Sequence, residues 1–204
     1  GEWRFDGHNM SRVVAHKTAS MGMVRTFQLT KSLTKMTVIE NMKLGAIHQV
    51  GEKWWKGLLP FLWKSQEAKI EERADTLLKR FKMDHMRNEY AGTLSGGQRK
   101  LLEMARALMT EPKLVMLDEP MAGVNPALKQ SLNEHIRGLR DDGMTVLFVE
   151  HDMDMVNDVA DWVVVMAEGI LIAEGTPEQI GSNPQVIEAY LGSNQGKSLL
   201  DRQV

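Results

Sequence analysis

The sequence contains no cysteine among its 204 residues, and its charges nearly balance. Without cysteine there is neither a disulfide framework nor a thiol nucleophile, which excludes disulfide-stapled scaffolds and cysteine-dependent catalysis. Lys and Arg total 25 against 27 Asp and Glu, so the chain has no overall basic field that would attract nucleic acid or anionic lipid. We therefore expect no nucleic-acid partner.

Long hydrophobic runs are also absent. No stretch of about 18 apolar residues occurs that could cross a bilayer as a helix. Residues 11–17 favour a short polar-flanked helix and do not form the long apolar segment of a signal peptide. Any role at a membrane is therefore expected to depend on a partner protein. The apolar share of 43% is enough for one core, so length and composition indicate one globular domain of ordinary size.

The sequence Leu-Ser-Gly-Gly-Gln at positions 94–98 has the chemistry of a helix start that faces an anion. Ser95 can cap a helix, and Gly96 and Gly97 let a phosphate approach bare backbone. Gln98 opens a run of strong helix formers, so the positive end of a helix dipole would point at the ligand.

The helix that follows, expected over residues 96–109, has one apolar face and one basic face. The apolar face carries Leu101, Met104, Ala105 and Leu108. The basic face carries Arg99, Lys100 and Arg106. These three side chains either contact solvent, as charged helix faces usually do, or help to hold a phosphate or a carboxylate.

A short apolar run at 114–117 ends in Asp118, Glu119 and Pro120. Such a run is typical of a strand buried on both faces of a parallel sheet, and ligands bind at the carboxyl ends of such strands. A second buried strand is expected at 145–149, and His151 follows it at the same edge of the sheet. A lone histidine after a strand is more often structural than catalytic.

In this order, and joined by one helix, the two motifs resemble the signature and Walker B motifs of the ABC-transporter ATPases. Each alone would also suit an ordinary loop or turn. The resemblance covers residues 1–192 and implies an α/β fold of the P-loop-NTPase type, a mostly parallel sheet flanked by helices. We expect a helical subdomain with the signature motif at 37–109, a core with Walker B and the histidine at 110–175, and a flexible tail at 193–204.

The C-terminal part of that core predicts a β-hairpin. Two β-rich runs, at 162–167 and 170–175, are separated by Glu168 and Gly169. Residues 176–179 then start a helix through a capping box.

The resemblance assigns catalytic roles at the sheet edge. Asp118 would hold Mg²⁺, partly through water, and Glu119 would polarise the water that attacks the γ-phosphate of ATP. Gln28, at the end of a strand expected at 22–28, would contact the metal and that water, although by itself it reads as a solvated loop amide. His151 would contact the γ-phosphate. ATP and Mg²⁺ are thus the implied cofactors.

The resemblance also implies partners. Ser95, Gly96, Gly97 and Gln98 would close over ATP bound to a second ATPase subunit, identical or homologous. Asn125 stands in the loop between the two subunits, where many ABC ATPases carry Asp. Transmembrane permease subunits would hold the pair at the cytoplasmic face of the membrane, and a periplasmic or extracellular solute-binding protein would act with them indirectly.

Within the family, the resemblance is greatest to importers of branched-chain or other hydrophobic amino acids. It is carried by residues 25–28, 37–41, 122–126, 150–153, 175–178 and 189–192. Urea importers are similar throughout, and lipopolysaccharide exporters share the ending. Both remain alternatives, because other subunits choose the solute.

The motif Gly-x-x-x-x-Gly-Lys-Ser/Thr, whose backbone and lysine cradle phosphates, does not occur in the sequence. In the family it lies upstream of the position of Gln28. We therefore expect an N-terminally truncated ATPase, without the first strand, the phosphate loop and the first helix, that binds nucleotide poorly when isolated. The alternative is a non-catalytic remnant that acts as a binding module.

The segment 49–66 contains Trp54, Trp55 and Trp63 among lysines and apolar residues. Three interpretations are open for it: packing on its own helical subdomain, contact with a partner protein, or contact with lipid.

Overall fold

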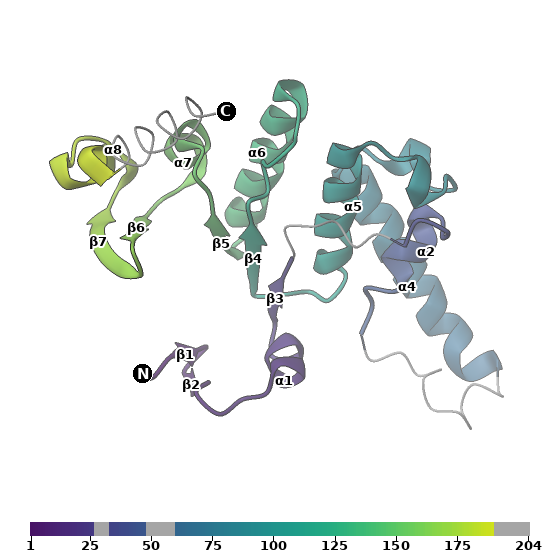
Figure 1. Cartoon of the computed structure of the whole chain (residues 1–204). Coiled ribbons are helices and arrows are strands. Elements are labelled where there is room, and N and C mark those ends of the chain that lie inside the picture. The colour runs from purple at the N-terminus through teal and green to yellow at the C-terminus, as the bar shows by residue number, and fades with distance from the viewer. Residues whose placement is uncertain (27–32, 48–59, 190–204) are drawn as a thin grey trace, which may run out of the picture. The chain divides into compact units, whose positions relative to one another are not determined.

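The computed structural model describes residues 1–26, 33–47 and 60–189 (Figure 1). The chain divides into two compact units, Gly1–Val149 and Glu150–Val204, and each is described by itself. Gln28, most of the tryptophan-rich segment and the tail expected at 193–204 lie outside the described residues. None of the helices formed by the described residues combines the length and the apolar character that a membrane span requires.

Three parallel strands form the sheet of the first unit (Figure 1). Their order is β3 (Met23–Arg25), β4 (Leu114–Asp118) and β5 (Thr145–Val149). Because the strands are parallel, their carboxyl ends meet at one edge of the sheet. This edge carries Arg25 from β3 and Asp118 from β4. The predicted α/β fold with a parallel sheet is confirmed.

Helix α6 (Pro126–Asp141) connects β4 to β5 and packs against β5. Asn125 caps it, with its side-chain oxygen accepting from the Leu128 amide at 2.9 Å. Proline at the first helical position suits this start because its missing N–H would have no partner there. The buried face of α6 consists of Leu132, His135, Ile136 and Leu139.

The exposure of β5 differs from the prediction. Leu147 and Val149 are 53% and 62% exposed, and they alternate with half-buried neighbours. Such alternation is what a strand shows when only one of its faces is covered. The prediction of a buried strand was therefore wrong for β5. It holds in part for β4, whose Val115 and Leu117 are buried while Met116 is only half-buried.

A helical part separates β3 from β4 in the sequence. It comprises α2 (Val38–Lys43), α4 (Pro60–Arg80), the short 3-10 helices η2 (Asp84–Met86) and η3 (Ala91–Thr93), and α5 (Gly96–Leu108). Helix α2 starts with a capping box of Thr37 and Glu40 and packs against α4 and α5. The shared core is formed by Val38, Met42, Ala74, Leu78, Phe81 and Leu102. Each large side chain buried there contributes about 1.5–3 kcal/mol.

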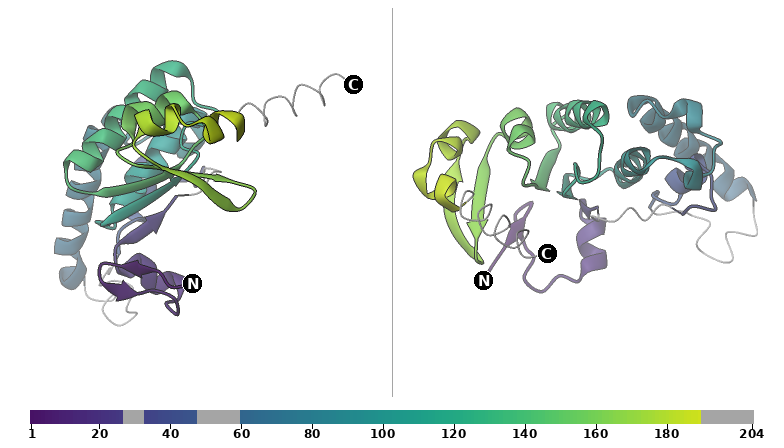
Figure 2. Two further views of the ribbon diagram at one scale, coloured as in Figure 1. Left: turned by 90° about the vertical axis from the view of Figure 1, so that its left-hand side faces the viewer. Right: turned by 45° about the horizontal axis from the view of Figure 1, so that its top comes forward.

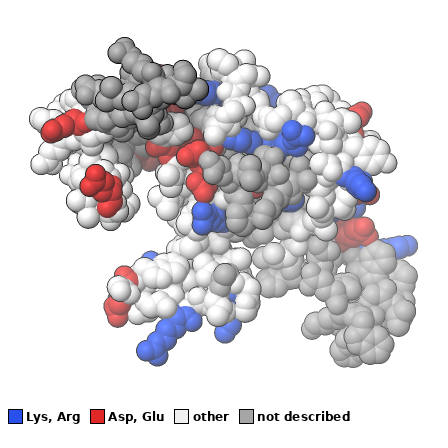
Figure 3. Space-filling view, viewed as in Figure 1, with Lys and Arg blue, Asp and Glu red and all other residues white. Residues whose placement is uncertain are grey.

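An ion-pair network ties α2 to α4 and to the turn after η2. The Glu71 carboxylate accepts from Lys43 at 2.9 Å and from Arg87, and Arg87 also donates to Asp75 at 2.7 Å. The hydrogen bond from Lys43 is the main reason why the pKa of Glu71 lies below its ordinary value. On the face shown in Figure 3, basic and acidic side chains are likewise interspersed.

The first residues form a small hairpin and a helix. Strands β1 (Arg4–Phe5) and β2 (His8–Asn9) pair antiparallel around Asp6 and Gly7, both with positive φ. Helix α1 (Ala15–Ser20) begins later than the helix expected at 11–17 and packs on β3.

The second unit contains the expected hairpin (Figure 2). Strands β6 (Val163–Ala167) and β7 (Ile170–Gly175) join through Glu168 and Gly169, whose φ angles of 49° and 80° fit a type I′ turn. Helices α7 (Met153–Val159) and α8 (Pro177–Gly181) flank the hairpin in sequence, and residues 184–189 are helical. The capping box of Thr176 and Gln179 starts α8 as predicted.

Candidate functional site

Two charged side chains meet where β3 and β4 end. The Arg25 guanidinium donates to Asp118 Oδ2 at 2.9 Å, and the two side chains are 59% and 31% exposed. Asp118 was predicted as a site residue from the sequence, whereas Arg25 was given no role of its own. The position of Arg25 beside Asp118 follows only from the pairing of β3 with β4, which the sequence did not reveal. The edge of the sheet therefore holds a solvent-accessible carboxylate that is already paired with a cation.

Glu119, the next residue, has an unusual backbone conformation. Its φ is 44°, in the left-handed region that residues other than glycine rarely adopt. This conformation costs about 1–3 kcal/mol and persists only where neighbours enforce it. The Glu119 amide donates to the Val149 carbonyl oxygen of β5 at 3.0 Å, and its carbonyl oxygen accepts from the Ala122 amide at 3.1 Å. The predicted catalytic carboxylate thus belongs to a turn whose backbone is strained and is held by hydrogen bonds on both sides of Glu119.

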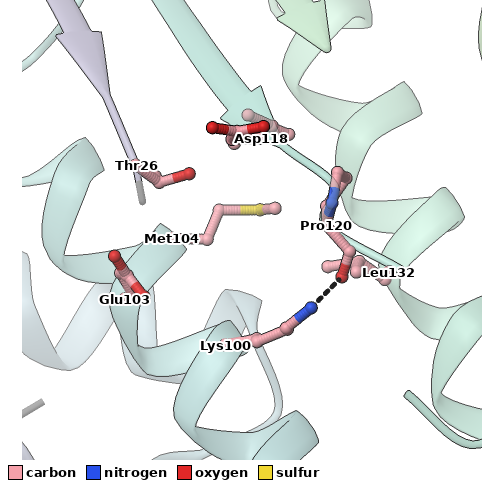
Figure 4. Close-up of a pocket in the computed structure, with 8 residues that line it drawn as sticks. Thr26, Lys100, Glu103, Met104, Asp118, Pro120 and Leu132 are labelled. Carbon is pink, nitrogen blue, oxygen red and sulfur yellow. Dashed lines mark hydrogen bonds between the residues drawn. The ribbon is translucent and has the colours of Figure 1, made fainter. Parts of the chain in front are cut away.

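Lys100 of α5 binds the same turn. Its ammonium group donates to the carbonyl oxygens of Glu119, Pro120 and Ala122 at 3.2, 3.1 and 2.5 Å. Figure 4 shows Lys100 reaching from α5 to Pro120. Solvent, phosphate and carboxylate were the surroundings expected for this basic face, and backbone carbonyl oxygens were not among them. Backbone carbonyls carry no sequence signature, and their position depends on the fold.

A small cavity lies between Lys100 and the end of β4 (Figure 4). It is lined by Thr26, Lys100, Glu103, Met104, Leu117, Asp118, Pro120 and Leu132. Its volume of about 20 Å³ suits about one water molecule and is far too small for a nucleotide. A larger ligand of Asp118 would therefore bind on the open side of the edge. Glu103 is a buried carboxylate, only 7% exposed, and nothing in its sequence context indicated that it would be buried.

The N-terminus of α5 has the predicted Ser95 cap, and Gln98 extends it to a capping box. The Ser95 side chain accepts from the Gln98 amide at 3.3 Å, and the Gln98 side chain accepts from the Ser95 amide at 2.8 Å. Both residues are thus used to begin the helix, and their backbone and side-chain dipoles are fixed. The positive end of the α5 dipole lies at this capped start, and its binding of an anion stays a prediction.

The two glycines of this motif have different surroundings. A Cβ atom at Gly96 would meet open space, whereas one at Gly97 would overlap Leu128 Cδ2 of α6. Gly96 therefore leaves room for a ligand. Gly97 lets α5 lie close to the Leu128 side chain of α6, a role that adds to the approach of a phosphate inferred from the sequence.

The donor set at the edge fits Mg²⁺ held together with phosphate. Among residues 1–26, 33–47 and 60–189, no three His, Cys, Asp or Glu side chains gather into a metal cage. Asp118 instead offers one accessible carboxylate. Mg²⁺ commonly takes only one or two protein carboxylates and completes its octahedron with water and substrate phosphates. The chemistry of Asp118 matches that mode of binding.

The remaining predicted site residues are Asn125, Gln28 and His151. Asn125 caps α6, six residues after Glu119 in the sequence, and its side chain is exposed. Gln28 lies outside the described residues. His151 belongs to the second unit, where its ring is 76% exposed and its Nδ1 lies 3.9 Å from Glu150 Oε2. That His151 joins Asp118 and Glu119 stays a prediction.

Comparison with known proteins gives consistent results along the chain. Residues 1–122 match the family model described as "ABC transporter". Residues 171–194 match the model described as "Branched-chain amino acid ATP-binding cassette transporter".

Two curated proteins illustrate the similarity. The chain is 42% identical to a probable branched-chain amino acid transport ATP-binding protein LivG of Archaeoglobus fulgidus, over 97% of this chain and 76% of that protein. It is 40% identical to the high-affinity branched-chain amino acid transport ATP-binding protein BraF of Pseudomonas aeruginosa, over 93% and 75%. A solved nucleotide-free ATP-binding cassette from an ABC transporter superposes with a TM-score of 0.76 at 37% identity, over 91% of this chain and 75% of the other.

Proposed function

The chain belongs to the ATP-binding family of ABC transporters, and from this premise we propose that it hydrolyses ATP to energise the import of branched-chain amino acids. One observation carries the proposal. The accessible carboxylate of Asp118 and the anchored Glu119 lie together at the carboxyl edge of a parallel sheet, where this class of fold binds its ligands.

Glu119 acts as the general base in this proposal. Its carboxylate orients and polarises the water that attacks the γ-phosphate, and the fixed turn sets the direction of that carboxylate. Asp118 holds Mg²⁺, partly through water. When bound, the metal neutralises charge on the phosphate oxygens. Arg25 would exchange its partner Asp118 for solvent or phosphate when the metal binds.

The start of α5 serves a second subunit. Gly96 and Gly97 would present backbone N–H groups to the phosphates of an ATP held by the opposite ATPase subunit. Ser95 and Gln98, whose amides are bonded to each other's side chains, would fix the start of the helix beside that ATP. The open space at Gly96 supports this role. ATP then stabilises the dimer, and hydrolysis releases it, which couples the reaction to movement in the membrane partner.

Three further residues complete the proposed site. Gln28 would contact the metal and the attacking water, His151 would contact the γ-phosphate, and Asn125 would lie in the loop between the two subunits. Their support is the family assignment together with their positions in the sequence. Asn125 already fulfils one structural role as the cap of α6.

The solute and the partners follow from the relatives. LivG and BraF are named as branched-chain amino acid transport proteins, and the C-terminal family match carries the same solute in its description. We therefore propose transmembrane permease subunits as direct partners at the cytoplasmic face of the membrane, with a solute-binding protein acting indirectly. These names favour amino-acid import over the urea and lipopolysaccharide alternatives.

Glu119→Gln in the complete gene product tests the catalytic proposal. Hydrolysis should fall roughly 100-fold or more, because the general base is lost. ATP-dependent dimerisation, measured by light scattering, should persist, because the amide keeps the size of the side chain. Glu168→Gln, in the turn between β6 and β7, is the control and should leave both measurements unchanged. Unchanged hydrolysis in Glu119→Gln would refute the role of Glu119.

The solute is tested separately. The ATPase is reconstituted with its permease in vesicles, and the uptake of leucine, isoleucine and valine is compared with that of urea. ATP-dependent uptake of the amino acids alone is the expected result. Uptake of urea alone, or of neither solute in vesicles that hydrolyse ATP, would overturn the assignment.

A further inference from the structure

The turn between β4 and α6 is held from two sides. On one side, β5 accepts the Glu119 amide through the Val149 carbonyl oxygen at 3.0 Å. On the other side, Lys100 of α5 binds the carbonyl oxygens of residues 119, 120 and 122. An ammonium group has three N–H donors, which allows it to bind several carbonyl oxygens of one turn. Hydrogen bonds from a charged donor are also stronger than neutral ones.

These bonds bear directly on the conformation of Glu119. Its φ of 44° is enforced by neighbours, and the peptide groups on both sides of its Cα are anchored. The amide of Glu119 is fixed by β5, and its carbonyl oxygen receives both Lys100 and the Ala122 amide. Since the carboxylate projects from that Cα, Lys100 determines part of its direction.

Helix α5 is attached to the same region at a second point. Gly97 packs so closely on Leu128 of α6 that a Cβ there would overlap Leu128 Cδ2. Lys100 lies one turn further along α5. The first two turns of α5 are therefore joined both to α6 and to the turn that carries Glu119. A displacement at the start of α5 is transmitted to that turn through these two contacts.

We infer that Lys100 is a positioning residue for Glu119 and links the occupancy of the α5 N-terminus to the direction of the catalytic carboxylate. The inference rests on the proposed function, because it takes Glu119 as the base and the start of α5 as a phosphate site. It adds that the ATP bound against α5 influences hydrolysis at the edge of the sheet in the same chain. In this inference Lys100 acts through the turn and not by contact with a nucleotide.

Lys100→Met tests this in the complete gene product, with Lys100→Arg as the conservative variant. For Met, kcat should fall roughly 10- to 100-fold, as expected when a catalytic group is misplaced without being removed. KM for ATP should change less than about twofold, because uniform binding is retained. Lys100→Arg should recover part of kcat, since its guanidinium can still donate to the carbonyls. Lys79→Met, on the exposed surface of α4, is the control and should leave kcat unchanged.

Hydrogen exchange supplies a second measurement that does not depend on turnover. In Lys100→Met, the Ala122 amide should exchange roughly tenfold faster, because its acceptor Glu119 is no longer held, while the amides of residues 101–105 should be unchanged. If the turn exchanges normally, or if kcat is normal in both variants, Lys100 does not position Glu119. If the wild-type protein does not hydrolyse ATP, the proposed function fails, and exchange still decides whether Lys100 holds the turn.

Discussion

The guanidinium of Arg25 lies 2.9 Å from Asp118 Oδ2 and joins the carboxyl ends of β3 and β4. The pair places the positive charge of Arg25 beside Asp118, the carboxylate that we assign to Mg²⁺. Both side chains remain partly exposed, so the ion pair is screened by solvent and is weak. Arg25 and the metal therefore compete for Asp118.

Arg25→Gln is expected to lower the Mg²⁺ concentration that supports half-maximal ATPase activity. An exposed ion pair of this kind contributes about 0.2–1 kcal/mol, so the shift should be about fivefold at most. The measurement is a Mg²⁺ titration at saturating ATP. Arg12→Gln, at an exposed position outside the sheet, is the matched control. A higher Mg²⁺ requirement in Arg25→Gln would mean that Arg25 assists the nucleotide instead of competing with the metal.

Gly97→Ala and Gly96→Ala should separate packing from ligand binding. The added methyl group at Gly97 overlaps Leu128, so the free energy of unfolding should fall by about 1–3 kcal/mol. At Gly96 it meets open space, so stability should be nearly unchanged while ATP-dependent dimerisation weakens. Urea unfolding and light scattering give the two measurements.

The double variant Gly97→Ala with Leu128→Ala checks the cause. Without the Leu128 side chain, the methyl group of Gly97→Ala has nothing to overlap. The double variant should therefore be about 0.5–3 kcal/mol more stable than the sum of the two single effects predicts. Strict additivity would show that Leu128 is not the obstacle.

Asn41→Ala is expected to destabilise the first unit. Asn41 is fully buried, and its side chain accepts from the Leu33 amide at 2.9 Å and donates to the carbonyl oxygens of Leu33, Met36 and Thr37. Its loss removes the acceptor of the Leu33 amide and three bonds to carbonyl oxygens that keep their backbone donors, so the free energy of unfolding should fall by about 1–3 kcal/mol.

The control for Asn41 is Asn157→Ala, because Asn157 is exposed on α7. A substitution at such a site should change stability by less than about 0.5 kcal/mol. Equal urea midpoints for the two variants would contradict the structural role of Asn41.

His135 predicts a pH dependence of stability. It is 7% exposed and its ring lies against Phe81, with centroids 4.5 Å apart. Burial, and then the nearby charges of Lys82 and Arg80, lower its pKa in the folded state below the ordinary value of 6.5. The unfolded chain therefore binds the proton more readily than the folded protein. The contribution of neutral His135 to the free energy of unfolding is complete above its pKa in the unfolded chain. It is lost as the pH falls through its pKa in the folded protein.

The measurement is the urea midpoint between about pH 7.5 and about pH 5.5 for the wild type and for His135→Gln, which cannot become charged. The wild type should lose more stability than the variant over this range. Parallel pH profiles would show that other groups cause the loss.

Local signals in the sequence predicted several element boundaries. The Ser95 cap and the capping box of Thr176 each start a helix where expected. These motifs succeed because the interacting groups lie within three residues of one another. The turn at Glu168 follows from equally local chemistry.

Features that depend on distant partners were not predictable. Lys100 and Arg25 each bind groups that lie far away in the sequence, and only the fold brings them together. The exposure of Leu147 depends on what covers the second face of β5, which an apolar run does not reveal. The role of Gly97 likewise required the position of Leu128.

The helical part inserted between β3 and β4 has a consequence for the entropy of the chain. Arg25 and Asp118 are 93 positions apart, yet their strands are direct neighbours in the sheet. The entropic cost of closing such a loop grows only with the logarithm of its length, and doubling the length adds about 0.6 kcal/mol. Insertions and deletions in this part should therefore leave the strand pairing nearly unaffected. The helical part can therefore change in length while the edge that carries Asp118 keeps its strand pairing.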